Sequence, residues 1–245
     1  MWPLILGGTL VGGVAWALLR KSSPSPNAGT GPAVSPPKTP VAVIPGGAKR
    51  GINGGSALRK ASLPGGDPFA NAAAVSTPDG QLWLVAPTYI APVSANDALR
   101  LAREAGGELP SPALVDAIWR AADLKIEPPT RAQNVVSQAV FDDQAAKVAA
   151  LIAQGEEALG HPAALVAGTH KDLVMFGGHA QLYGWHVEDS KAAAFTARKG
   201  IPLHAAFTAG PGRIIQGPSG SVHSPDFLDY SQGLRLVRKA PTPAV

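Results

Sequence analysis

The sequence predicts an α+β protein with an N-terminal transmembrane helix, a disordered linker rich in Pro and Gly, and helices followed by a small, mostly antiparallel sheet. Three observations carry this prediction. Residues 2–19 hold no charge, residues 22–70 are rich in Pro, Gly, Ser and Ala, and helical periodicity gives way to short β-type runs after Pro162. The expected boundaries are 1–21 for the anchor, 22–70 for a flexible basic linker and 71–240 for one domain.

The anchor segment reads WPLILGGTLVGGVAWALL over residues 2–19. At about 1.5 Å of helical rise per residue it spans roughly 27 Å, which is enough to cross a hydrocarbon core. A cleaved signal peptide is the competing interpretation, but no charged n-region precedes this stretch and no small-residue cleavage site follows it. We therefore expect contact with a lipid bilayer through residues 2–19, as a single-pass protein of a bacterial inner membrane or a virion membrane. Arg20 and Lys21 then favour the cytoplasm, or the particle interior, for the following chain.

The linker contains stretches such as SPSPNAGTGP and VSPPKTP. Such a composition cannot bury enough apolar area to offset the entropy of the chain, and Pro-rich stretches favour an extended geometry. This composition therefore predicts that the linker is a spacer between the membrane and the folded domain.

The first half of the domain carries signals for helix starts and ends. Ser94 followed by Asp97 is an N-cap pattern, and the apolar stripe that follows ends at Gly106. Ser111 with Pro112 at the first helical position opens a second helix of apolar residues at helical spacing. Two helices are therefore expected here, after a strand or hairpin in QLWLVAPTYIAP.

The second half of the domain changes character. A third helical region is expected from Asp143 to Leu159, where Ala and Gln are frequent. After Pro162 the chain shows the runs AALVAG, DLVMF, QLYGWHV, LHAAF, RIIQ and LRLV, separated by Gly, Pro, Asp and Ser. These runs predict the strands of the antiparallel sheet.

Composition excludes several classes of chemistry. The 245 residues contain no Cys, which excludes disulfides, thiolate zinc sites, iron–sulfur clusters and a cysteine nucleophile. The first 66 residues hold seven Lys and Arg and no acid, whereas the remainder holds 14 basic and 17 acidic residues, a net charge of −3. The domain therefore offers no broad cationic face, and no sequence-specific nucleic-acid partner is expected.

Histidine is concentrated in the predicted sheet, since five of the six lie between residues 170 and 223. On a strand His170 and Asp172 would point to the same face and Lys171 to the other. A histidine beside a carboxylate suits a general base, and equally a metal ligand with its supporting residue. The candidate catalytic residues are His170, Asp172, His186, His223, Asp229 and Arg235.

These candidates have distinct expected roles. His170 and His186 are expected to act as base or ligands, Asp172 and Asp229 as orienting groups or ligands, and Arg235 or Lys171 as charge stabilisers. No HExxH spacing and no phosphate-binding or dinucleotide fingerprint is present, so the metal and cofactor stay unassigned. The alternative is that the same residues form a hydrogen-bonded polar network in the core.

Several runs along the domain form a recognisable set of motifs: DALRLAREAGGELPSPALVDAIWRAADLK, LVAGTHKDLV, LYGWH, IIQ and H…LDYSQGLRLV. These runs cover about Gln81 to Val237 and resemble a family of largely uncharacterised bacterial and phage proteins. Gln232 stands where the family is expected to carry His, which weakens any mechanism that needs that imidazole. The resemblance implies a compact polar cluster without an established reaction. The residues that match the family motifs are His170, Lys171, Asp172, Tyr183, Trp185, His186, Gln216, His223, Asp229, Tyr230, Ser231, Gly233 and Arg235.

Two functions follow from the combination of span, linker and polar cluster. The leading hypothesis is a membrane-tethered hydrolase acting on a cell-envelope polymer, peptidoglycan first, held at a bacterial envelope or delivered by a phage particle. The alternative is a non-catalytic minor membrane or structural protein of a virion, or an envelope tether. The partners differ accordingly, peptidoglycan in the first case and capsid or envelope proteins in the second.

Overall fold

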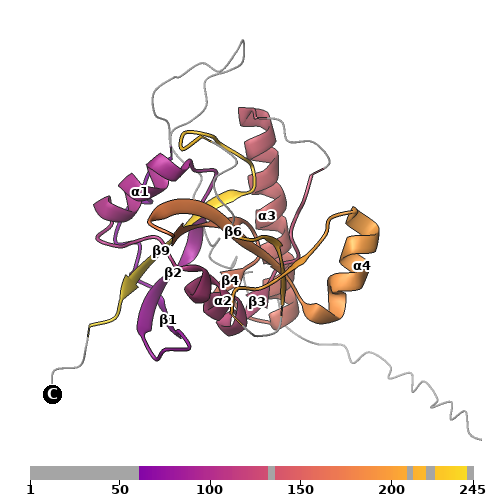
Figure 1. The fold of residues 1–245 in the computed structure, drawn as a ribbon, viewed down its shortest axis with the longest axis horizontal. Coiled ribbons are helices and arrows are strands. Elements are labelled where there is room, and N and C mark those ends of the chain that lie inside the picture. Colours follow the sequence, from indigo (N-terminus) through magenta and orange to yellow (C-terminus); the bar gives the residue numbers. More distant parts are fainter. Residues whose placement is uncertain (1–60, 132–135, 209–211, 219–223, 242–245) are drawn as a thin grey trace, which may run out of the picture. The chain divides into compact units, whose positions relative to one another are not determined.

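The computed structural model describes residues 61–131, 136–208, 212–218 and 224–241, and its elements are labelled in Figure 1. The helices are α1 (Ala95–Glu104), α2 (Pro112–Ala121), α3 (Gln138–Leu159) and α4 (Asp189–Lys199). The strands are β1 (Ala73–Ser76), β2 (Leu82–Ile90), β3 (Leu124–Lys125), β4 (Val166–Ala167), β5 (Lys171–Phe176), β6 (His179–Val187), β7 (His204–Ala205), β8 (Arg213–Gln216) and β9 (Gln232–Lys239).

Seven strands form one sheet in the order β1-β2-β9-β5-β6-β8-β7. Neighbouring strands in it are antiparallel except β5 and β9, which run parallel. The short β3 and β4 form a separate parallel pair. The C-terminal β9 thus lies in the middle of the sheet and joins the N-terminal hairpin to β5 and β6.

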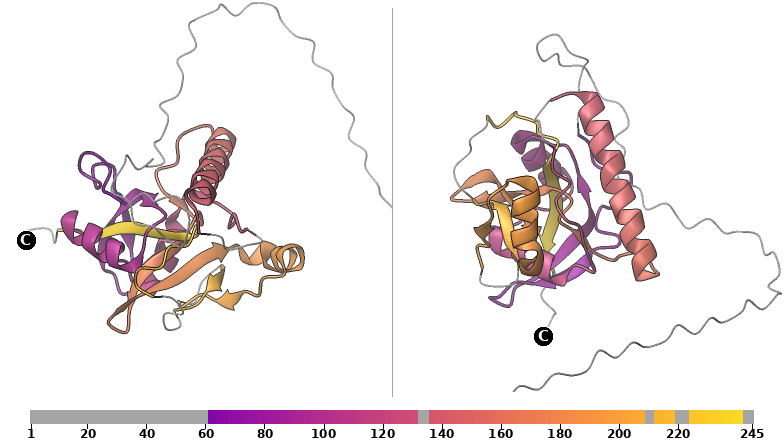
Figure 2. Two further views of the ribbon diagram at one scale, coloured as in Figure 1. Left: turned by 90° about the horizontal axis from the view of Figure 1, so that it is seen from above. Right: turned by 90° about the vertical axis from the view of Figure 1, so that its right-hand side faces the viewer.

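Helices α1 and α2 pack against opposite faces of this sheet. Leu234 and Leu236 of β9 belong to the apolar cluster that contains α1, whereas Val237 packs with α2. On β5, Leu173 joins the α1 side and Val174 the α2 side. This is the alternation of side chains that a strand buried on both faces requires. The long α3 and the C-terminal helix α4 lie at different edges of the fold (Figure 2).

The predicted fold class is confirmed at the level of a mixed α and β domain with a mostly antiparallel sheet. Two predicted helix starts are also confirmed, because the Ser94 hydroxyl accepts from the Asp97 N–H at 3.2 Å and the Ser111 hydroxyl accepts from the Leu114 N–H at 3.2 Å. Pro112 occupies the first turn of α2.

The strand or hairpin expected in QLWLVAPTYIAP is present as β2. The expected order of helices first and sheet afterwards holds only in part, because β1 and β2 precede the described helices yet belong to the main sheet, and α4 lies between β6 and β7. Helix α3 begins at Gln138 rather than Asp143, capped by Ser137. The sequence of α4 gave no prediction because Phe195 is its one buried residue, so it lacks an apolar stripe.

The anchor expected at residues 1–21 lies outside the described residues, as does the linker up to residue 60. Among the helices of the described ranges, none combines the length and apolarity that crossing a membrane requires. Ala61 and Phe69, which fall in the segment expected to be linker, are buried in the cluster around α1.

Candidate functional site

Asp116 of α2 is the centre of a buried hydrogen-bond network. Its Oδ1 accepts from the Tyr183 hydroxyl at 2.7 Å and lies 2.8 Å from Nε2 of His186. Its Oδ2 accepts from the backbone N–H and the hydroxyl of Thr208 at 2.7 and 2.8 Å. Burial opposes ionisation, but the hydrogen bonds from His186, Thr208 and Tyr183 outweigh it and hold the pKa of Asp116 below its usual value. Because a carboxylate only accepts, Nε2 of His186 is the donor in this contact.

A backbone irregularity in β6 lets two of its side chains reach the same helix. Residues three apart on a regular strand point to opposite faces. Gly184 and Trp185 both adopt left-handed backbone conformations, with φ of 87° and 60°, and break this alternation. Tyr183 and His186 therefore both face α2. The left-handed conformation is costly for Trp185, because it has a Cβ.

The ring of His186 is fixed by packing as well as by hydrogen bonding. Trp119 of α2 stacks on it with ring centroids 5.2 Å apart and an interplanar angle of 16°. A Cβ on Gly184 would lie 3.2 Å from the His186 ring, and one on Gly212 would lie 2.8 Å from Nε1 of Trp119. Two glycines thus make room for the stacked pair.

A second polar group lies beside the first, formed by Tyr89, His170, Asp172 and Arg235. The Tyr89 hydroxyl donates to Oδ2 of Asp172 at 3.0 Å, and the Arg235 guanidinium lies 3.8 Å from the centroid of the Tyr89 ring. Arg235 is fully buried and donates to the carbonyls of Ala86, Pro87 and Val166. Arg235 therefore links its own strand β9 to β2 and β4, and its charge is not accessible to solvent.

Burial shifts the pKa values in this second group in opposite directions. Desolvation, reinforced by Arg235, lowers the pKa of His170 to about 3, so the imidazole is neutral at physiological pH. Desolvation raises the pKa of Asp172 to about 7, although Arg235 and the hydroxyl of Tyr89 act against the rise. Burial also raises the pKa of Tyr89. Asp172 is thus a carboxyl group that changes its charge near neutral pH.

The two groups meet at an internal cavity of about 10 Å³ that His170, Asp172, Trp185 and His186 help to line. Oδ1 of Asp172 and Nε1 of Trp185 are buried and have no hydrogen-bond partner among the described residues. A polar cavity of this size holds about one water molecule. It is too small for a sugar ring or a peptide.

Most of the predicted site residues are brought together, but not all. His170, Asp172, His186 and Arg235 lie on the α2 side of the sheet. Asp229 lies elsewhere, accepting from the N–H and hydroxyl of Ser231 at 3.1 and 2.8 Å. His223 falls outside the described residues.

A metal centre receives no further support from the geometry. In the part of the chain that the structure describes, no group of three or more His, Asp or Glu side chains is arranged to hold a metal ion.

Sequence reasoning missed Asp116 and Tyr89, and it named Tyr183 only as a residue that matches the family motifs. The signal for Asp116 was present, because it is the one charged residue inside the apolar run ALVDAIW of α2. A carboxylate on the buried face of a helix needs partners.

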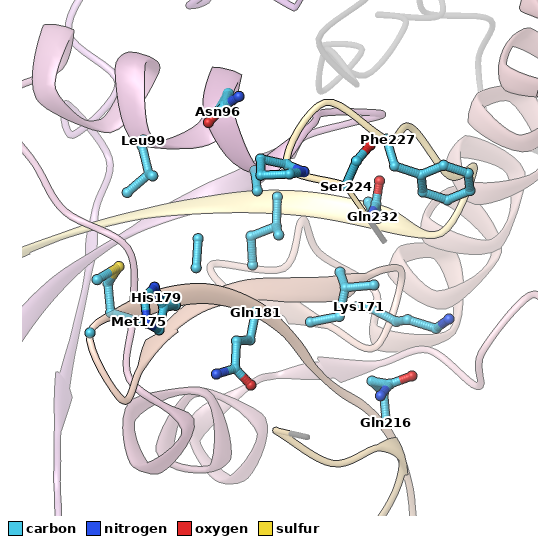
Figure 3. Close-up of a pocket in the computed structure, with 16 residues that line it drawn as sticks. Asn96, Leu99, Lys171, Met175, His179, Gln181, Gln216, Ser224, Phe227 and Gln232 are labelled. Atoms are coloured by element: carbon cyan, nitrogen blue, oxygen red, sulfur yellow. The ribbon is translucent and has the colours of Figure 1, made fainter. Parts of the chain in front are cut away.

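The opposite face of the sheet carries a groove of about 290 Å³ between α1, β5, β6 and the segment before β9. Figure 3 shows Lys171, Gln232, Ser224 and Phe227 toward one end and Met175 and His179 toward the other. This groove is far larger than the internal cavity, and Lys171 is the candidate charge stabiliser that lines it.

Comparisons of the chain with protein-family models, with curated proteins and with solved structures give no match.

Proposed function

We propose that this protein is a membrane-held, non-catalytic tether whose domain binds an extended polar polymer of the cell envelope, with peptidoglycan as the first candidate. The observation that carries the proposal is the burial of three of the predicted catalytic residues, His170, Asp172 and His186. His170, Asp172 and His186 are 7%, 3% and 3% exposed, and the cavity that they share has about the volume of one water. Among the described residues, these three side chains therefore offer almost no surface that a polymer strand could contact.

The network around these residues has the properties of a structural core. Both oxygens of Asp116 accept hydrogen bonds, and the two terminal nitrogens of Arg235 donate to backbone carbonyls, although its Nε has no partner among the described residues. Buried hydrogen bonds of this kind fix one arrangement of the surrounding elements. The open groove on the other face, with Lys171 at one end, is instead accessible to a ligand.

Co-sedimentation with purified peptidoglycan sacculi tests this function. Full-length protein in mild detergent is mixed with sacculi, pelleted and quantified in both fractions. We expect the protein to pellet with the sacculi in a saturable manner. If the protein stays in the supernatant at every sacculus concentration, the proposed function is contradicted.

One observation favours hydrolysis as the second candidate. Asp172, with its pKa raised to about 7 and a free Oδ1 at the cavity, has the chemistry of a general acid or base. A hydrolase would release soluble muropeptides from sacculi and lose that release on Asp172→Asn while remaining folded.

A further inference from the structure

The groove on the α1 face contains Lys171, whose ammonium forms a long ion pair with Asp229 and no hydrogen bond among the described residues. The Lys171 side chain is 15% exposed, and its Nζ lies 3.8 Å from Oδ2 of Asp229, beyond hydrogen-bonding distance. That carboxylate is already engaged by the backbone and hydroxyl of Ser231. Within the described ranges, no acceptor lies at hydrogen-bonding distance from the Lys171 ammonium, which also sits 5.3 Å from the centroid of the Trp185 ring.

A second donor lies beside the lysine. Gln232 of β9 is the register partner of Lys171 on β5, so the two residues are neighbours on adjacent parallel strands, about 4.8 Å apart. The Gln232 side-chain oxygen accepts from the Asp229 N–H at 2.8 Å, which fixes the orientation of the amide. Its NH₂ group therefore points away from that N–H, and both Gln232 and Lys171 line the groove.

The rest of the groove combines apolar and polar side chains, the polar ones being Asn96, His179, Gln181, Gln216 and Ser224. Leu99 of α1, Leu173 of β5 and Leu182 of β6 line it, and Met175 lies at its far end (Figure 3). A ligand that matches this lining carries an anionic group at one end, with both methyl or methylene groups and hydrogen-bonding groups along its length. A volume of about 290 Å³ matches the small end of ordinary ligand pockets.

We propose that this groove binds the carboxylate-bearing end of a short peptide or amino-sugar segment. The carboxylate lies against the ammonium of Lys171 and the NH₂ of Gln232, and its methyl groups lie over the leucines. A carboxylate is favoured over a dianionic phosphate because Asp229 is close to the same position. The identification of peptidoglycan as the source rests on the proposed function, whereas the site itself does not.

Isothermal titration calorimetry of full-length protein in detergent tests the site. The probe is N-acetylmuramyl-L-alanyl-D-isoglutamine, which has acetamido and methyl groups and one free terminal carboxylate. The controls are its carboxamide analogue and inorganic phosphate. The variants are Lys171→Gln and, as a matched control, Lys147→Gln on the exposed side of α3.

Wild type and Lys147→Gln should bind the probe equally, and Lys171→Gln should bind it about tenfold more weakly or worse, because one charge-assisted hydrogen bond is lost. The carboxamide analogue should be weakened by a similar factor on wild type, which tests the carboxylate even if Lys171→Gln does not fold. Equal binding of probe and carboxamide, tighter binding of phosphate, or no heat with wild type would overturn the proposal.

The sacculus assay separates this proposal from the function. If Lys171→Gln binds sacculi as well as wild type does and the probe does not bind, the carboxylate site in the groove is contradicted and the envelope tether still stands. If the probe binds but sacculi do not, the tether is contradicted and the carboxylate site still stands.

Discussion

Asp116 lies on the apolar face of α2, where an ionised carboxyl group is tolerated because both of its oxygens accept hydrogen bonds. Replacing it with Asn keeps the shape but turns an NH₂ group toward donors. Asp116→Asn should lower the free energy of unfolding by about 2–4 kcal/mol, since buried donors lose their acceptor. Denaturant unfolding measures this loss.

The matched control is Glu157→Gln on the exposed side of α3, which should change stability by less than about 0.5 kcal/mol. If Asp116→Asn is as stable as this control, the network does not stabilise the fold.

Asp172 makes the free energy of unfolding depend on pH, because its pKa differs between the folded and the unfolded chain. In the folded protein this pKa is about 7, above the ordinary value of 3.8. The stabilisation that the protonated Asp172 provides is therefore fully present below pH 3.8 and is lost as the pH rises through 7. His170, lowered from 6.5 to about 3, has the opposite sign and gains stability over that range. The two trends partly cancel in wild type, and a variant is needed to separate them.

Asp172→Asn removes the pH dependence due to Asp172 and leaves the one due to His170. Relative to wild type, the free energy of unfolding of the variant should rise by about 3 kcal/mol between about pH 5 and about pH 8, because each unit of pKa shift is worth about 1.4 kcal/mol. Unfolding curves of both proteins at the two pH values give this difference. A difference that does not change with pH would show that Asp172 is ionised throughout.

The starts of α1 and α2 were predicted accurately from sequence, whereas the start of α3 was placed five residues too late. Ser94 and Ser111 act as caps through local hydrogen bonds, which depend on residues only three positions apart. Helix α4 was missed because its packing depends on one residue, Phe195, and the placement of β1 and β2 in the main sheet depends on pairing with the distant β9. Local rules do not determine such distant pairings.

The candidate site likewise combines features that depend on nearby residues with features that depend on the fold. The proximity of His170 and Asp172 could be predicted from spacing along the chain, whereas the convergence of Tyr183 and His186 on Asp116 depends on two left-handed residues in β6. Trp185 gives no sequence signal for such a conformation, since it is not a residue that favours it.

The junction of β9 with β5 depends on Gly233. A Cβ at this position would lie 2.8 Å from Cβ of His170 and 2.8 Å from Cδ1 of Tyr89. Gly233→Ala should therefore destabilise the domain by about 1–3 kcal/mol through overpacking. The control is Gly217→Ala, where nothing lies within 4 Å of the added carbon. Equal thermal midpoints for the two variants would contradict the tight packing at this junction.

At the scale of the whole molecule, the segment 1–21 remains a sequence prediction of a membrane anchor. Full-length protein should stay in the membrane pellet after an alkaline carbonate wash, because eighteen uncharged residues gain free energy in lipid. Removing residues 1–21 should release a soluble protein with unchanged circular dichroism, since the core clusters lie within residues 61–241. Recovery of full-length protein with Met1 intact in the wash would contradict the anchor.

The central claim is that the enclosed His and Asp cluster stabilises the domain of an envelope-binding tether and performs no reaction. The most direct measurement is muropeptide release from sacculi that have pelleted wild-type protein, read by chromatography across pH and with added divalent metals. The account predicts bound protein and no release above buffer. Release by wild type that disappears in a folded His186→Ala variant would contradict it.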